Sequence, residues 1–181
     1  MTALLRWSRS ATRLVAVNAL VLAASLGAGW AVGTASAGAN GGNVFQHTAG
    51  ESQDALTDVT IILEGNLRVI ATLLLGACTL GLLSVAAVAW NGFGLGVGLA
   101  VLARESPEVV YLLLRYLPFE FSAFVLASAA SMSLSRWIVM VLGAIDGATL
   151  RPAASLLASS LTLIALAAVI EAGVKHALAG R

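Results

Sequence analysis

Charged residues are scarce in this chain. Only 10% of its 181 residues are Asp, Glu, Lys or Arg, whereas 59% are hydrophobic. Soluble domains contain about 25% charged residues. This chain has too few charged residues to form the water-exposed surface of a soluble domain. A bilayer tolerates such a composition when each segment satisfies its own backbone hydrogen bonds. We therefore predict an all-α, polytopic helical membrane protein that forms a single membrane domain over residues 1–181.

Residues that carry common chemistry are also scarce. The single cysteine, Cys78, cannot form an intramolecular disulfide, and the two histidines, His47 and His176, have no metal ligand at helical spacing. The net charge of +1, without a basic stripe among aromatics, gives no support for nucleic-acid binding. The chain has neither a G-x-S-x-G element nor a Walker A motif. We expect a non-enzymatic protein without catalytic residues, cofactor or metal, and any ATP-driven step would need a separate subunit.

The hydrophobic residues form blocks, several of them close to the roughly 20 residues that cross a bilayer. The first block, 14–36, contains the signal-peptide-like Ala35-Ser36-Ala37, but its apolar core exceeds the usual length of about 7–15 residues, which favours a retained span. The short block 91–104 is either a protein-buried span or half of a re-entrant hairpin, so four or five crossings are compatible with the sequence, and we expect about five. Further spans are predicted at 67–90, 119–143 and 153–171.

Charge patterning orients the chain. Three arginines and no acid precede the first block, whereas residues 37–64 hold four acids and no Lys or Arg. The positive-inside rule then places the N-terminus in the cytoplasm and residues 37–64 outside the cell membrane. Residues 37–50 have a loop composition, and Glu51, Asp54 and Asp58 recur at helical spacing. This spacing predicts an amphipathic helix on the membrane surface. A second interfacial helix is predicted over 107–117.

Four glycines follow the 67–90 block at two overlapping GxxxG spacings: Gly92, Gly94, Gly96 and Gly98. This spacing lets helices approach closely in lipid, whereas the alternative is a flexible loop. We predict helix packing through these glycines, including self-association of copies of the chain.

Polar residues at the edges of the predicted spans are the candidate site. They are Asn66, Arg68, Asn91, Glu120 and Glu171. A carboxylate at the bilayer centre costs roughly 2.5–3.5 kcal/mol, so such residues face protein or water, unless they only mark the interface. With five crossings, the two glutamates and Asn66 lie at the outer membrane edge. They would form one polar cluster there, which Arg68 or Arg115 could neutralise.

The sequence around these positions resembles the stage II sporulation protein M family of integral membrane proteins. The matching elements are, in order, IILEGNLRVI with Asn66, AVAWNGFGLG with Asn91, LPFEFSAFVLASA with Glu120, and LAAVIEAGV with Glu171. Together with the N-terminal span, the resemblance covers about residues 10–175. The chain departs from the family where paired asparagines are common, having Gly65 before its asparagine, and it lacks the Pro-His-Gly run before the glutamate.

The resemblance implies a non-enzymatic membrane scaffold or accessory subunit of an envelope or export complex. The founding member works with peptidoglycan hydrolases during forespore engulfment, and some relatives are associated with ATP-driven export. The alternative is a permease subunit of a transporter that works with a separate ATPase. The expected partners are the lipid bilayer, further copies of the chain, and either envelope hydrolases or a transporter ATPase, but no nucleic acid.

Overall fold

The computed structural model describes residues 2–36, 55–142 and 150–179. All regular structure in these residues is helical, in the order α1 (Thr2–Ser36), α2 (Ala55–Leu75), the 3-10 helix η1 (Gly76–Thr79), α3 (Leu82–Glu105), α4 (Pro107–Leu113), α5 (Leu117–Val141) and α6 (Arg151–Ala179). Five segments are long and apolar enough to cross a membrane: Ala11–Ser36, Thr57–Thr79, Leu82–Glu105, Leu117–Val141 and Arg151–His176. The predicted all-α polytopic fold is confirmed, with five membrane segments.

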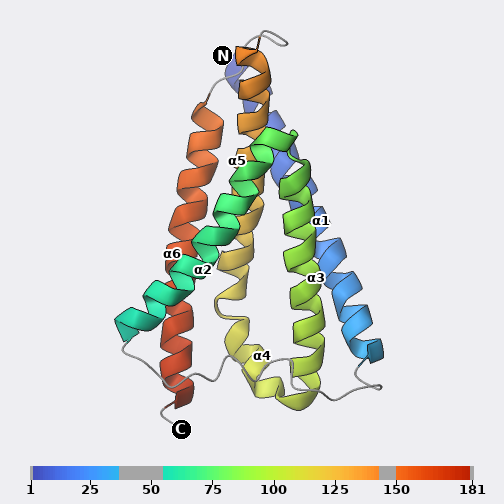
Figure 1. The fold of residues 1–181 in the computed structure, drawn as a ribbon, viewed down its shortest axis with the longest axis vertical. Coiled ribbons are helices and arrows are strands. Elements are labelled where there is room, and N and C mark those ends of the chain that lie inside the picture. Colours follow the sequence, from blue (N-terminus) through green and yellow to red (C-terminus); the bar gives the residue numbers. More distant parts are fainter. Residues whose placement is uncertain (1, 37–54, 143–149, 180–181) are drawn as a thin grey trace.

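The five long helices alternate in direction, so the two termini lie at opposite ends of the bundle (Figure 1). α5 is the central helix and contacts α1, α2, α3 and α6. α2 crosses the bundle at a tilt, and the turn that joins it to α3 points towards the N-terminal end (Figure 1). The short α4 lies at the other end, between the end of α3 and the start of α5.

The boundaries of two predicted spans are wrong. Residues 67–90 are not one span, because the chain turns back at η1 and continues through Leu80 and Gly81, which both have positive φ. α2 instead begins at Ala55, so the described part of the predicted surface helix is the first portion of a membrane segment. Residues 91–104 are the second half of α3, a full-length segment, which excludes the re-entrant reading. The turn contains no charged residue, so the hydropathy pattern does not separate it from the apolar residues on either side.

Serine hydroxyls satisfy the carbonyl groups of this apolar turn. Ser84 donates to the carbonyl of Leu73 at 2.6 Å, and Ser135 of α5 donates to the carbonyl of Ala77 at 2.9 Å. The hydroxyls of Ser84 and Ser131 lie 2.8 Å apart. A non-helical backbone at membrane depth requires such partners. The small residues of α5 therefore form a close helix contact, as predicted, and they also cap the α2–α3 turn.

The α1–α3 contact is built from small residues on both helices. A Cβ added to Gly96 would lie 2.1 Å from the carbonyl oxygen of Leu26, and one added to Gly92 would lie 2.3 Å from the Ser25 hydroxyl. From the α1 side, a Cβ on Gly29 would lie 2.0 Å from the carbonyl oxygen of Phe93. Gly92 and Gly96 thus pack closely against α1, and this contact occurs within one chain.

The other two predicted glycines behave differently. Gly98 is buried in α3. Gly94 has no heavy atom within 4 Å of an added Cβ, so it makes no close helix contact within the described part of the chain. Self-association through the face of Gly92 and Gly96 loses its structural basis, because α1 already occupies that face.

Candidate functional site

Three helices bring three of the candidate polar residues together, towards the end of the bundle opposite the N-terminus. α2 and α5 both start at the end opposite the N-terminus, and α6 finishes there (Figure 1). Asn66 lies on the inward stripe of α2 together with Ile62, Ile70 and Leu73, and is only 8% exposed. Glu120 lies in the first turn of α5, after a proline that opens the helix, and Glu171 lies in the last part of α6.

These three side chains form one polar cluster. The Asn66 side chain hydrogen-bonds to the Glu120 carboxyl group, and the Glu120 and Glu171 carboxyl groups interact electrostatically. The cluster predicted from the sequence is therefore present as a spatial group. Two carboxyl groups in a site of low polarity repel each other when both are ionised, so a proton or a neighbouring cation must compensate them.

Two further residues, which sequence reasoning missed, complete the polar cluster. Lys175 lies one helical turn after Glu171, with its Nζ 3.9 Å from Glu171 Oε1. Tyr116, which precedes α5, is only 8% exposed. Burial raises the pKa of the Tyr116 hydroxyl, and the negative charges of Glu171 and Glu120 raise it further. Tyr116 is therefore a neutral hydroxyl beside two carboxyl groups. The i,i+4 acid–base spacing of Glu171 and Lys175 was readable from the sequence.

Apolar side chains enclose the polar cluster on two sides. Leu99 and Leu117 pack with Tyr116 and with the partly buried Phe121 and Ile170. On the α2–α6 side, a second group surrounds the cluster and comprises Val59, Ile62, Leu63, Ala168 and Ala172. The cluster is still partly exposed at the surface of the bundle, because the Glu171 side chain retains 19% exposure.

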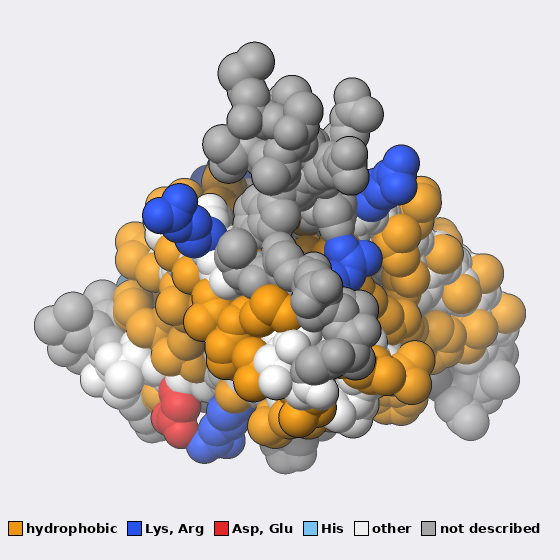
Figure 2. All heavy atoms as spheres, turned by 90° about the horizontal axis from the view of Figure 1, so that it is seen from above, with side chains coloured by type: hydrophobic (Ala, Val, Ile, Leu, Met, Phe, Trp, Pro, Cys, Tyr) orange, Lys and Arg blue, Asp and Glu red, His pale blue; other side chains and the backbone are white. Residues whose placement is uncertain are grey.

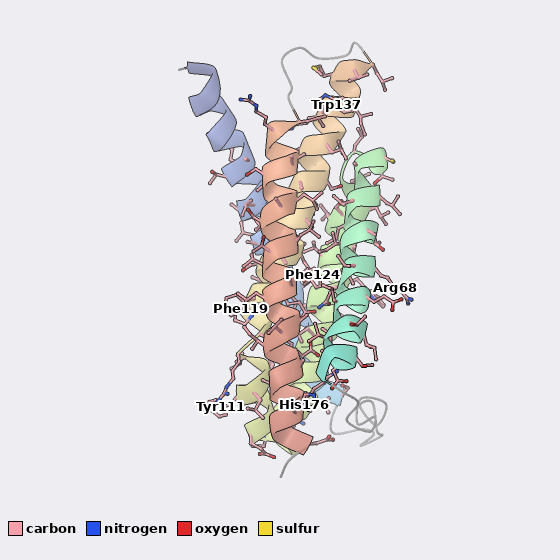
Figure 3. All side chains as sticks on the ribbon, turned by 90° about the vertical axis from the view of Figure 1, so that its left-hand side faces the viewer. Arg68, Tyr111, Phe119, Phe124, Trp137 and His176 are labelled. Atoms are coloured by element: carbon pink, nitrogen blue, oxygen red, sulfur yellow. The ribbon has the colours of Figure 1, made fainter. Side chains whose placement is uncertain are left out.

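Two predicted site residues lie outside the polar cluster. Asn91 donates from Nδ2 to the carbonyl of Ala87 at 2.8 Å, within its own helix. Arg68 points away from the bundle, as Figure 3 shows, and pairs with Glu64 on the same face of α2. The prediction that Arg68 neutralises the cluster is wrong, because its place on the helix turns it outward, and Lys175 is the cation beside Glu171. Arg115 is exposed.

A separate contact joins α2 to α6 below the polar cluster. His176 Nε2 lies 3.5 Å from Asp58 Oδ2. His176 thus has a specific neighbour rather than only solvent. In the described residues, no group of three His, Cys, Asp or Glu side chains could hold a metal ion.

A multi-pass helical membrane protein with an internal polar cluster is the class that this fold defines. The family model described as stage II sporulation protein M matches residues 16–174, which is most of the chain, and the chain belongs to this family. The matched region includes Asn66, Asn91, Glu120 and Glu171. No curated protein and no solved structure matches the chain.

Proposed function

We propose that this protein is a non-enzymatic scaffold or accessory subunit of a membrane complex, and that the polar cluster contributes to assembly with its partner. One observation carries the proposal. Asn66, Glu120 and Glu171 are three of the four polar residues on which the family resemblance rests, and they converge from three helices although they are far apart in sequence. Burying these groups in a membrane domain is costly, which argues for a role that balances the cost.

The hydroxyl groups of the bundle support a structural rather than a catalytic role. Ser128 donates to the side-chain oxygen of the fully buried Asn18 at 2.6 Å, which ties α5 to α1. Ser160 donates to the carbonyl of Ala123 at 2.8 Å, which ties α6 to α5. Such interhelical hydrogen bonds hold membrane helices together. These serines therefore serve helix packing.

The distribution of arginines supports a cytoplasmic N-terminus in this proposal. Arg13, Arg136 and Arg151 are exposed at the N-terminal end of the bundle, and Figure 2 shows basic side chains around that end. Further basic residues lie at the opposite end, but the arginines before the first span usually dominate orientation. The polar cluster then faces the outer side, which favours a partner in the cell envelope over a cytoplasmic ATPase.

The orientation can be measured by cysteine labelling. In a Cys78→Ser background, we expect Thr48→Cys and Ala179→Cys each to react with a membrane-impermeant thiol reagent in intact cells. Both sites lie on the side opposite the N-terminus when the chain crosses five times. Protection of both sites with reaction only after permeabilisation would reverse the orientation. A reactive first site with a protected second site would contradict five crossings.

The permease subunit is the second candidate, and the polar cluster is also the observation that favours it. Carboxyl groups within membrane segments can mark a cation or proton pathway. The partner separates the two functions, because a permease subunit requires a cytoplasmic ATPase.

Co-purification of partner proteins tests both the scaffold role and the permease role. We expect the wild-type protein, extracted in mild detergent, to retain an envelope hydrolase in a stoichiometric amount, and Glu120→Gln to lose it without loss of folding. Glu108→Gln is the control, since Glu108 is an exposed acid on α4, at the same end of the bundle. A stoichiometric ATPase would establish the alternative, and the absence of any stoichiometric partner would contradict both.

A further inference from the structure

The outer face of α2 carries a polar stripe at the depth of the membrane. Thr60, Glu64, Arg68 and Thr72 follow one another at intervals of four residues, so they share one side of the helix. The side chains of Arg68 and Glu64 are 79% and 62% exposed. Arg68 is the central residue of the Thr57–Thr79 membrane segment, and Figure 3 shows it pointing outward at about the level of the core residue Phe124.

The hydrocarbon chains of lipids do not solvate this polar stripe well. Charged side chains within membrane segments face protein or water, because hydrocarbon does not solvate them. Together Glu64 and Arg68 carry no net charge, but the ion pair still lies on the outside of the bundle. None of the described helices covers it, because the two side chains are mostly exposed. A protein surface outside this chain is the neighbour that fits.

The charge pattern of the stripe identifies that surface. It holds one acid and one base a single turn apart, so it has no net charge that would select an oppositely charged partner. It is instead complementary to itself. When two copies are related by a two-fold axis along the membrane normal, their α2 helices run in the same direction across the membrane and cross at this face, where each Glu64 can meet Arg68 of the other copy.

Gly65 makes the same face suitable for close contact. No heavy atom lies within 4 Å of a Cβ added to Gly65, so its side of the helix is flat and open. Small residues at such positions allow two membrane helices to approach closely. We propose that this face of α2, comprising Thr60, Glu64, Gly65, Arg68 and Thr72, is the interface with a second copy of this chain. The proposal is independent of the scaffold role and replaces the face of Gly92 and Gly96, which α1 covers, as the site of self-association.

Disulfide cross-linking in native membranes tests the interface directly. In a Cys78→Ser background, we expect Gly65→Cys to form a covalent dimer under mild oxidation, at a yield at least about tenfold above the control. The control is Thr162→Cys, because Thr162 is exposed near the middle of α6. Equal yields at the two positions, or no dimer at Gly65→Cys, would overturn the proposal.

Charge reversal gives a second test that a folding defect cannot mimic. Arg68→Glu leaves only acids in the interface, and Glu64→Arg leaves only bases, so each variant alone should be monomeric by light scattering, at the 18.4 kDa of one chain rather than twice that mass. The two variants with different tags, when co-expressed, should co-purify as a heterodimer, and the double variant with both changes should form a homodimer. Dimeric single variants, a wild-type monomer, or a stripe covered by a different protein would overturn the proposal.

Discussion

Replacing Gly96 by alanine should push α1 and α3 apart. The added Cβ would lie 2.1 Å from the carbonyl oxygen of Leu26 and 2.7 Å from the backbone nitrogen of Trp30. Ordinary van der Waals contact begins at 3.4 Å, so the facing backbone must retreat by more than 1 Å (3.4 − 2.1 Å). Both obstacles are main-chain atoms, so no change of side-chain rotamer relieves the clash.

The expected loss follows from overpacking. Inserting a methyl group into a close-packed contact typically costs about 1–3 kcal/mol. The retreat also weakens the neighbouring close contacts of Gly29 and Gly33 with α3, which depend on the same helix separation. Alanine recovers up to about 1 kcal/mol through its higher helix propensity. We therefore expect Gly96→Ala to lower the free energy of unfolding by a net of about 1–2 kcal/mol.

Gly94→Ala is the matched control on the same helix. It makes the same chemical change two residues away, where no heavy atom lies within 4 Å of the new Cβ. We expect its stability to stay unchanged or to rise by up to about 1 kcal/mol. Reversible unfolding by SDS in mixed micelles, followed by tryptophan fluorescence, measures both variants. Equal stability of the two variants would refute the close approach of α1 and α3.

Three further predictions concern the turn, the α2–α6 contact and the buried tyrosine. Ser135→Ala should cost about 1–3 kcal/mol in the same unfolding assay, because it leaves the carbonyl of Ala77 without its partner, whereas Ser133→Ala removes only a bond within its own helix. Asp58→Asn should cost no more than about 1 kcal/mol, and salt should reduce the difference, because the contact with His176 is partly exposed. The raised pKa of Tyr116 keeps its hydroxyl protonated above the ordinary value of 10.0, so its contribution to stability is complete below that pH and decreases above it. A Tyr111→Phe variant, in which Tyr116 is the remaining tyrosine, should show no tyrosinate absorbance at about pH 11 while folded, and its appearance there would contradict the burial.

The sequence contained enough information for the fold class and the polar cluster. Long apolar blocks specify helices in lipid because no other element satisfies an isolated backbone there. Glu120 and Glu171 stand out for the same reason, since an ionisable residue enclosed by apolar neighbours needs a partner. The alternation of membrane helices then brings both glutamates together with Asn66, towards the end of the bundle opposite the N-terminus.

The sequence did not reveal where the chain reverses direction, which helices pack against each other, or which side of its helix Arg68 occupies. The turn at Gly81 has no charge, and its carbonyls are satisfied by Ser84, which directly follows the turn, and by Ser135, which is distant in sequence. A hydropathy pattern therefore shows one continuous apolar block across the turn. The partner of Gly96 was equally hidden, because a GxxxG spacing does not say which helix lies opposite. Arg68 turned outward because a helix position two residues after the buried Asn66 lies on the far side.

The central claim is that Glu120 and Glu171 act as one unit in partner assembly, and a double-mutant cycle tests it most directly. The measured quantity is the amount of partner retained by Glu120→Gln, Glu171→Gln and the double variant after purification, with folding verified for each. Because the two carboxyl groups interact in one cluster, the account predicts that the double variant loses little more partner than the worse single variant. Independent sites would instead give additive losses. Additive losses, or wild-type retention by both single variants, would contradict the claim.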